Sequence, residues 1–227
     1  MNLKILNELE RVIKTSPQVL RDPFKLRQLI QATFNVTVMD TGGTLATLTD
    51  KIDEAVLGKY FGEIWQPKTK HFKYSGLKIV DEINKLQPRS VLDLGCGYNE
   101  FKGKINNLIG IDPYNNKADL EVGTLQYRTD QKFDVILCLG SVNFGSRDKI
   151  IAEVGRCVDL LAEGGTMFFR VNPGVQHDKP EADWIEFYAW NVPFIIELSE
   201  MYNLKILDIR DDTNQRKYFV YKKQSTQ

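Results

Sequence analysis

Cysteine and histidine are scarce in this sequence, and their scarcity excludes several kinds of site. The 227 residues include three cysteines and two histidines. Cys96, Cys138 and Cys157 are far apart, and no C-x-x-C pair is present. An odd count without metal-ligand spacing argues against a disulfide framework and against a metal site. A reducing, cytoplasmic setting is the simplest expectation.

The sequence also lacks an excess of charge and long apolar runs. Lys+Arg and Asp+Glu number 30 each, so the formal net charge is zero. A strongly basic nucleic-acid-binding protein is therefore not indicated, although a local patch leaves a nucleic-acid partner open. No apolar run approaches the roughly 20 residues of a membrane span. The first residues predict an amphipathic helix rather than a signal peptide, and we expect no membrane partner.

What is present changes in character near residue 75. Residues 1–75 predict a helical cap that recognises the substrate, with helices near residues 3–13, 23–30 and 49–61. Residues 76–227 predict the core, in which helical patterns alternate with short apolar runs. This alternation is typical of a doubly wound α/β fold with a mostly parallel sheet. The runs lie at residues 91–94, 108–111, 120–125 (weak), 133–139 and 166–171, and residues 204–209 and 217–221 predict a terminal hairpin with an antiparallel strand at one edge.

The stretch SVLDLGCGYNEF, residues 90–101, joins an apolar run to a glycine-rich loop. Glycines at 95 and 97 would let the backbone turn tightly and approach a ligand. A helix expected after the loop would offer N–H groups to an anionic group. About 19 residues beyond Asp93, Asp112 ends the next apolar run, where a carboxylate can accept both hydroxyls of a ribose. The two features together predict a nucleotide-type ligand.

A dinucleotide is disfavoured as that ligand because the loop lacks a third glycine. Asn99 stands near the position of that third glycine. Asparagine tolerates a left-handed backbone conformation, so the turn itself is still allowed. Glu100 would put a negative charge at the helix start, facing a pyrophosphate. Asp93 in the lead-in suits a cationic ligand group better. A nicotinamide oxidoreductase is therefore the weaker hypothesis.

In this context VLDLGCG resembles the first motif of class I S-adenosylmethionine-dependent methyltransferases, and residues 109–112 resemble their second. Residues 132–136 are similar to their fourth strand, residues 161–166 to the turn before the fifth, and the hairpin to their reversed seventh strand. The resemblance covers roughly residues 70–223. It implies a seven-stranded Rossmann-like sheet that binds S-adenosylmethionine and its product S-adenosylhomocysteine. More faintly, residues 139–144 and 170–174 are similar to methyltransferase-like proteins of tailed phages.

The resemblance also implies a set of cofactor contacts. The loop around Asp93 would flank the methionine part, Asp112 would take the ribose, and Leu125 would line the adenine. The full set is Asp93, Gly95, Cys96, Gly97, Asp112, Pro113, Leu125, Leu139, Gly140 and Ser141.

Two departures from the family pattern keep a non-catalytic binding protein as an alternative. The segment from Asp112 to Phe133 is about half the length of a helix–strand–helix unit, so we expect the second crossover helix to be lost. The usual acid near the adenine is also not evident at residues 124–126.

Candidate catalytic residues are few because methyl transfer from a sulfonium needs no acid for its neutral leaving group. Asn143 could orient an acceptor or only form a polar turn. His177 could act as a general base or be an exposed loop histidine. Tyr74 could touch the ligands or belong to a solvated connector. The aromatic cluster Trp184, Phe187, Tyr188 and Trp190 predicts core or interface at helical spacing more than a substrate stack.

The methyl acceptor is not identified by any motif. A small molecule is slightly favoured because the net charge is zero and no nucleic-acid signature is present. Residues 140–144, in particular, lack the Asn/Asp-Pro-Pro-aromatic pattern of amino-methylating nucleic-acid enzymes. Methylation of a nucleic acid or a protein remains the alternative.

Overall fold

A computed structural model describes residues 1–66 and 76–224, and the chain divides into two compact units. The helical unit comprises Met1–Trp65 and Gln176–Phe187, and the sheet unit comprises Gln66–Val175 and Tyr188–Gln227. The boundary predicted at residue 75 lies outside the described residues. The return of residues 176–187 to the first unit was not anticipated from the sequence.

Each helix of the helical unit begins at a side-chain cap. The helices are α1 (Leu3–Thr15), α2 (Pro23–Phe34) and α3 (Leu45–Lys59), and a π-helical turn, η2 (Tyr60–Ile64), follows α3. Asn2 accepts the first N–H groups of α1, Asp22 accepts those of α2, and Thr44 accepts from Thr47. Because Thr44 is the cap, α3 begins four residues before the predicted start at residue 49.

The sheet unit contains six strands among the described residues, in the order β2-β1-β3-β4-β6-β5. Strands β1 to β4 are mutually parallel, and β6 is antiparallel to both β4 and β5. The reversed strand is thus β6, inside the sheet, whereas the prediction placed the antiparallel strand at the edge. The bounds are β1 (Val91–Leu94), β2 (Leu108–Ile111), β3 (Phe133–Cys138), β4 (Leu161–Val171), β5 (Leu204–Asp211) and β6 (Lys217–Lys223).

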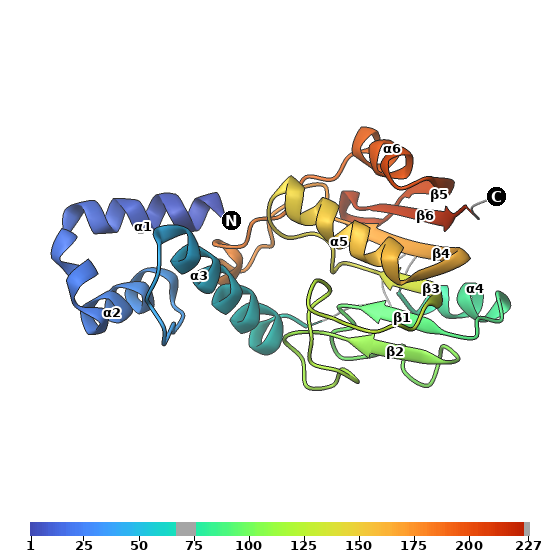
Figure 1. Cartoon of the computed structure of the whole chain (residues 1–227), viewed down its shortest axis with the longest axis horizontal. Coiled ribbons are helices and arrows are strands. Elements are labelled where there is room, and N and C mark those ends of the chain that lie inside the picture. The colour runs from blue at the N-terminus through green and yellow to red at the C-terminus, as the bar shows by residue number, and fades with distance from the viewer. Residues whose placement is uncertain (67–75, 225–227) are drawn as a thin grey trace. The chain divides into compact units, whose positions relative to one another are not determined.

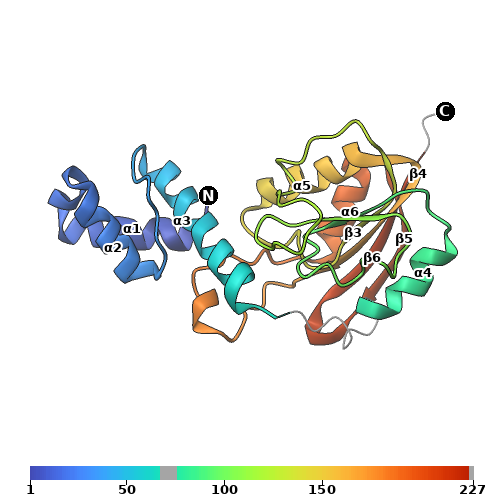
Figure 2. The same cartoon turned by 90° about the horizontal axis from the view of Figure 1, so that it is seen from below.

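Helices cover both faces of this sheet, as the doubly wound prediction requires (Figures 1 and 2). Helices α5 (Arg147–Leu160) and α6 (Val192–Met201) pack on one face, and α4 (Ile79–Lys85) packs on the other. Neighbouring residues of one strand enter opposite cores: Ile136 belongs to the α5 and α6 side, while Val135 and Leu137 belong to the α4 side. This alternation is the period of two of a strand buried on both faces.

Two predicted elements of the sheet unit are absent from the described residues. No helix follows the glycine loop, because residues 96–107 form a series of turns. Gly97, Asn99, Gly103 and Asn107 all have positive φ there, which a right-handed helix does not allow. The strand predicted at residues 120–125, the third in chain order, is also missing, and within that range only Leu120 forms an isolated bridge, to Ile111.

Other predictions had mixed outcomes. The loss of the second crossover helix is confirmed, since residues 112–132 hold no helix. The apolar period of residues 146–161 predicts a helix that the glycines 164 and 165 stop. The observed helix α5 ends at Leu160, within one residue of that prediction, and the two glycines lie within β4, where its pairing with β3 shifts register. The aromatic cluster does not lie on a helix: Trp184 and Phe187 belong to the helical unit, and Tyr188 and Trp190 to the sheet unit. Within residues 1–66 and 76–224, no helix combines the length and apolarity needed to cross a membrane.

A buried ion pair closes the sheet unit near the carboxyl end of β4. The Nε atom of Arg170 lies 2.6 Å from Oδ2 of Asp212, and the side chains are 3% and 0% exposed. The preceding residue, Asp211, forms an ion pair with Lys217, but its side chain is 75% exposed. The two adjacent aspartates therefore offer a matched comparison.

We predict that Asp212→Asn lowers the free energy of unfolding by about 3 kcal/mol, because it leaves a buried guanidinium without its counter-charge. The matched control Asp211→Asn should cost about 1 kcal/mol or less, since exposed pairs contribute little. Urea unfolding of the two variants and the parent protein measures both values. Equal effects at the two positions would contradict the burial of the pair.

Candidate functional site

The glycine loop folds back onto the end of the neighbouring strand β2. The backbone N–H groups of Gly95 and Cys96 both donate to the carbonyl of Ile111, at 2.8 and 3.0 Å. Gly95 and Gly97 have φ of +69° and +55°, the left-handed region that favours glycine. A Cβ atom at Gly95 would lie 2.3 Å from Cβ of Ser141. Glycine is therefore required at this point for close approach as well as for conformation.

Asn99 takes part in the same turn. Its φ of +56° places it in the left-handed region, and its Nδ2 donates to the carbonyl of Lys117 at 3.1 Å. A Cβ at Gly110 would lie 2.5 Å from Oδ1 of Asn99, so the absence of a side chain at Gly110 makes room for it. Asn99 is thus a left-handed turn residue, a conformation that asparagine tolerates.

Two buried carboxylates flank the loop. Asp112, 8% exposed, accepts from the N–H of Gly97 at 3.0 Å and from the N–H of Tyr114 at 2.8 Å. Burial raises its pKa, although these N–H donors act in the opposite direction. Asp93 is 2% exposed, and burial, with a smaller effect from the charge of Asp112, raises its pKa to about 7. Asp93 therefore titrates near neutral pH.

Several buried polar atoms around the loop lack partners. Within the described part of the chain, Oδ2 of Asp93, Oδ1 of Asn99 and Oγ of Ser141 have no hydrogen-bond partner. Asp93 precedes the loop, Asn99 lies in its turn, and Ser141 packs against Gly95. Buried polar atoms are normally satisfied, so this concentration is a feature of a ligand site.

The segment after β3 supplies another side of the site. Gly140 has φ of +118°, and a Cβ there would have no neighbour within 4 Å among the described residues. The side chain of Asn143 braces this segment: Nδ2 donates to the carbonyl of Gly140 at 2.9 Å, and Oδ1 accepts from the N–H of Asn172 at 2.8 Å. Asn143 is 1% exposed, so its contacts give it a structural role, and contact with an acceptor stays a prediction.

The remaining predicted site residues are spread more widely. A Cβ at Gly123 would lie 3.9 Å from Cβ of Pro113, which places residue 123 beside the Asp112 corner. Sequence reasoning missed Gly123. Leu125 borders an open hollow with Gly155 and Arg156 in the C-terminal half of α5, and its contact with an adenine stays a prediction.

Neither of the other two catalytic candidates, His177 and Tyr74, is among the described residues of the sheet unit. His177 belongs to the helical unit, where its Nδ1 lies 2.8 Å from the hydroxyl of Tyr60 and its ring packs against Phe187. Tyr74 lies outside the described residues. Their catalytic roles stay predictions.

The site is built from backbone, carboxylates and small polar groups. Across the residues that the structure describes, no cluster of three or more His, Cys, Asp or Glu side chains could hold a metal ion. The thiol of Cys96 is half-buried, and burial raises its pKa well above the ordinary value, so it is not a thiolate nucleophile. What the arrangement can do is hold a polar ligand with a cationic group over the carboxyl ends of β1, β2 and β3.

Comparison with known proteins identifies the fold. No protein-family model and no curated protein matches the sequence. Among solved structures, the chain is similar to a 1,6-didemethyltoxoflavin-N1-methyltransferase from Burkholderia thailandensis, with a TM-score of 0.58 and 13% identity over 84% of this chain and 95% of that one. The chain therefore has the Rossmann-like fold of class I S-adenosylmethionine-dependent methyltransferases.

Two further structures agree. The CcbJ methyltransferase from Streptomyces caelestis has a TM-score of 0.52 and 12% identity, over 75% of this chain and 96% of that one. An O-methyltransferase family protein from Burkholderia thailandensis has a TM-score of 0.50 and 12% identity, over 98% of this chain and 72% of that one. At such low identity, the likeness establishes the fold alone.

We predict that Gly95→Ala destabilises the protein more than Gly103→Ala. Both glycines have φ near +70°, so each substitution costs about 1–2 kcal/mol in left-handed strain. Only Gly95→Ala also forces a Cβ against Ser141, which adds about 1–3 kcal/mol of overpacking. Denaturant titration gives both values, and equal losses would contradict the close approach at Gly95.

Asp93 should make stability depend on pH. Its pKa is 3.8 when unfolded and about 7 when folded, so between these values the folded protein holds a proton that the unfolded chain releases. The free energy of unfolding therefore falls as pH rises from about 4 to 7. Asp93→Asn removes this dependence, and the difference between parent and variant should change by on the order of 3 kcal/mol across the window. Urea titrations at several pH values measure it, with the exposed Asp130→Asn as control; a pH-independent difference for Asp93→Asn would refute the burial.

Proposed function

We propose that the chain is an S-adenosylmethionine-dependent methyltransferase. The observation that carries the proposal is the glycine-opened corner between β1 and β2. There Asp93 and Asp112 flank the backbone of Gly95–Gly97. Buried polar atoms around this backbone, such as Oδ2 of Asp93, have no hydrogen-bond partner among the described residues. In an open α/β sheet, this carboxyl edge is where ligands bind. The methyltransferase fold narrows the class of ligand to the sulfonium cofactor.

The residues present fit that cofactor. The carboxylate of Asp112 accepts from backbone N–H groups through both oxygens, and because a carboxylate has about four acceptor positions, it can also accept from a ribose. Asp93, whose Oδ2 has no hydrogen-bond partner among the described residues, directly precedes the loop. There it would flank the methionine part of the cofactor, which carries the cationic groups. When bound, the cofactor supplies an electrophilic methyl group on a positively charged sulfur.

The chain's own contribution to such a transfer is positioning. The Gly95–Gly97 backbone, fixed by its bonds to Ile111 and Asp112, holds the edge of the site rigid. The braced turn from Gly140 to Asn143 fixes the segment opposite. Holding reactants in a productive geometry can supply much of a rate enhancement. Acid catalysis is not required, because the leaving sulfur departs neutral. A base is needed only if the acceptor must lose a proton, and His177 remains the candidate for that role.

The acceptor that we favour is a small molecule. The 1,6-didemethyltoxoflavin-N1-methyltransferase compared above was solved with 1,6-didemethyltoxoflavin and S-adenosylhomocysteine bound, and this supports the preference for a small molecule. Zero net charge supports it as well. A nucleic acid or a protein is the alternative acceptor, and the cytoplasmic setting and the faint phage-like similarity stay predictions.

A second candidate function is binding of the cofactor without catalysis. The reduced segment 112–132, which holds no helix, favours it because part of the usual adenine side is missing. Asn99 does not favour it, since this residue adopts the left-handed turn conformation that the loop needs.

We predict that S-adenosylmethionine and S-adenosylhomocysteine bind and that NAD does not. Asp112→Ala should weaken binding of both by about tenfold or more, because two charge-assisted bonds to the ribose are lost. Isothermal titration of the parent protein, Asp112→Ala and the control Asp130→Ala, an exposed aspartate that should leave binding unchanged, measures this. Binding of NAD with no response to the sulfonium would refute the proposal, and cofactor binding without turnover on any acceptor would favour the non-catalytic candidate.

A further inference from the structure

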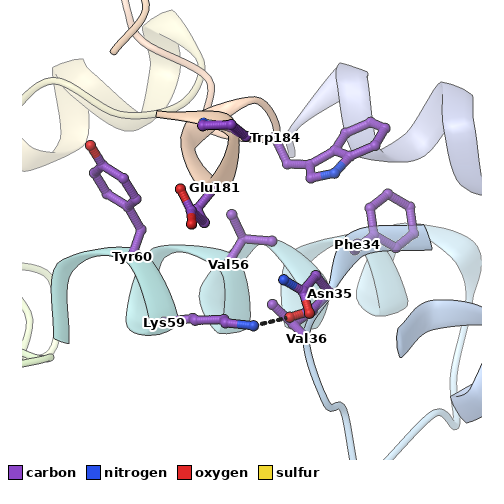
Figure 3. Close-up of a pocket in the computed structure, with 9 residues that line it drawn as sticks. Phe34, Asn35, Val36, Val56, Lys59, Tyr60, Glu181 and Trp184 are labelled. Carbon is purple, nitrogen blue, oxygen red and sulfur yellow. Dashed lines mark hydrogen bonds between the residues drawn. The ribbon is translucent and has the colours of Figure 1, made fainter. Parts of the chain in front are cut away.

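A cavity of about 190 Å³ lies within the helical unit, between α2, α3 and the segment around residues 180–184 (Figure 3). An engineered apolar cavity of about 150 Å³ holds one benzene ring. The cavity of the helical unit therefore has room for one ring with short substituents. It is formed entirely by residues of this unit.

About half of the wall is apolar, and the rest is polar. Phe34 and Trp184 meet edge to face with ring centroids 4.9 Å apart, and Figure 3 shows them together at one end. Val36 and Val56, both buried, lie along the wall, and Tyr60 stands at the other end. Such a wall suits an apolar or aromatic body.

Two opposite charges border this wall. Nζ of Lys59 donates to the carbonyl of Asn35 at 2.6 Å, which fixes the ammonium and leaves two of its three donors for other partners. The Glu181 side chain lies on the opposite side, above α3 and between Tyr60 and Val56. Within the described residues, Lys59 and Glu181 form no ion pair with each other.

The end near Tyr60 is the negative one. Burial raises the pKa of Tyr60, and the negative charges of Glu181 and Asp178 raise it further. That hydroxyl is already bonded to Nδ1 of His177 at 2.8 Å, so Tyr60 presents mainly its ring to the cavity. The cavity is thus bordered by one carboxylate, that of Glu181, and by one ammonium, that of Lys59.

We propose that this cavity binds a small zwitterion with an apolar body, of the size and chemistry of an aromatic amino acid. The ligand's ammonium group would face Glu181, its carboxylate would face Lys59, and its ring would lie against Phe34 and Trp184. Charge-assisted hydrogen bonds are the stronger kind, so both charged ends contribute to recognition. A ligand with only one charge would leave one of these protein groups unmatched.

The first test compares three probes by isothermal titration of the full chain. L-phenylalanine carries both charges, 2-phenylethylamine lacks the carboxylate, and 3-phenylpropanoate lacks the ammonium. L-phenylalanine should bind tighter than either analogue by about tenfold or more, the effect of one charge-assisted hydrogen bond. Equal binding of the three probes, or no binding of L-phenylalanine at millimolar concentration, would overturn the proposal.

Two variants then assign the charges. Glu181→Gln should weaken the binding of L-phenylalanine and 2-phenylethylamine but not that of 3-phenylpropanoate. Lys59→Met should weaken the binding of L-phenylalanine and 3-phenylpropanoate but not that of 2-phenylethylamine. Glu54→Gln and Lys14→Met make the same charge changes in the helical unit away from the cavity lining and should change nothing. Circular dichroism confirms that each variant is folded. Uniform weakening of all three probes by either variant would count against the assignment.

The site goes beyond the proposed methyl transfer and does not rest on it. Titration of the parent protein and of Asp112→Ala with S-adenosylmethionine in the same series reports on the glycine loop of the sheet unit, because only binding at that loop depends on Asp112. Failure of that titration would leave the zwitterion site intact, and failure of the L-phenylalanine titration would leave the cofactor site intact.

Discussion

Three consecutive backbone N–H groups, those of Gly95, Cys96 and Gly97, donate to the end of β2. Two reach the carbonyl of Ile111, and the third reaches the carboxylate of Asp112. This contact ties the loop of one strand to the last residues of its neighbour, and it requires that no Cβ stand between Gly95 and Ser141. This contact between the loop and β2 sets the direction of the Asp112 side chain. It also constrains the conformation of Asn99 and the position of the segment after β3.

The same geometry accounts for the unusual electrostatics of the site. Bringing the loop this close removes water from Asp93 and Asp112, and no described cation offsets the two charges there. Desolvation therefore acts on both carboxyls, and Asp93 holds its proton up to near neutral pH. A cationic ligand beside Asp93 would favour the ionised form. The unfavourable burial of this carboxyl thus serves selectivity for positive charge better than it serves stability.

The parts of the fold that could be predicted from the sequence are those with strong local signals. Asp22 followed by Pro23 is the pattern of an N-cap and a first-turn proline, and the apolar period of residues 146–161 is helical; the structure has α2 and α5 at these places. The turns after the glycine loop could not be predicted, because Asn99 and Asn107 do not reveal from sequence whether they take positive φ. The contacts of Asn143 depend on Asn172, 29 residues away, and no local pattern encodes such a pair. The return of residues 176–187 to the helical unit is similarly non-local.

The missing third strand of the sheet is replaced by side-chain and loop contacts on β2. As the edge strand, β2 would otherwise present open backbone groups, which natural sheets avoid. Here the carboxylate of Asp119 accepts from the N–H of Gly110 at 2.8 Å, and the N–H of Asp119 donates to the carbonyl of Gly110 at 2.8 Å. Leu120 accepts from the N–H of Asp112 at 3.2 Å. A short loop therefore closes the edge where a strand would be expected. Because it also holds the backbone of Asp112, the shortened segment can keep this carboxylate at the end of β2 without a crossover helix or a third strand.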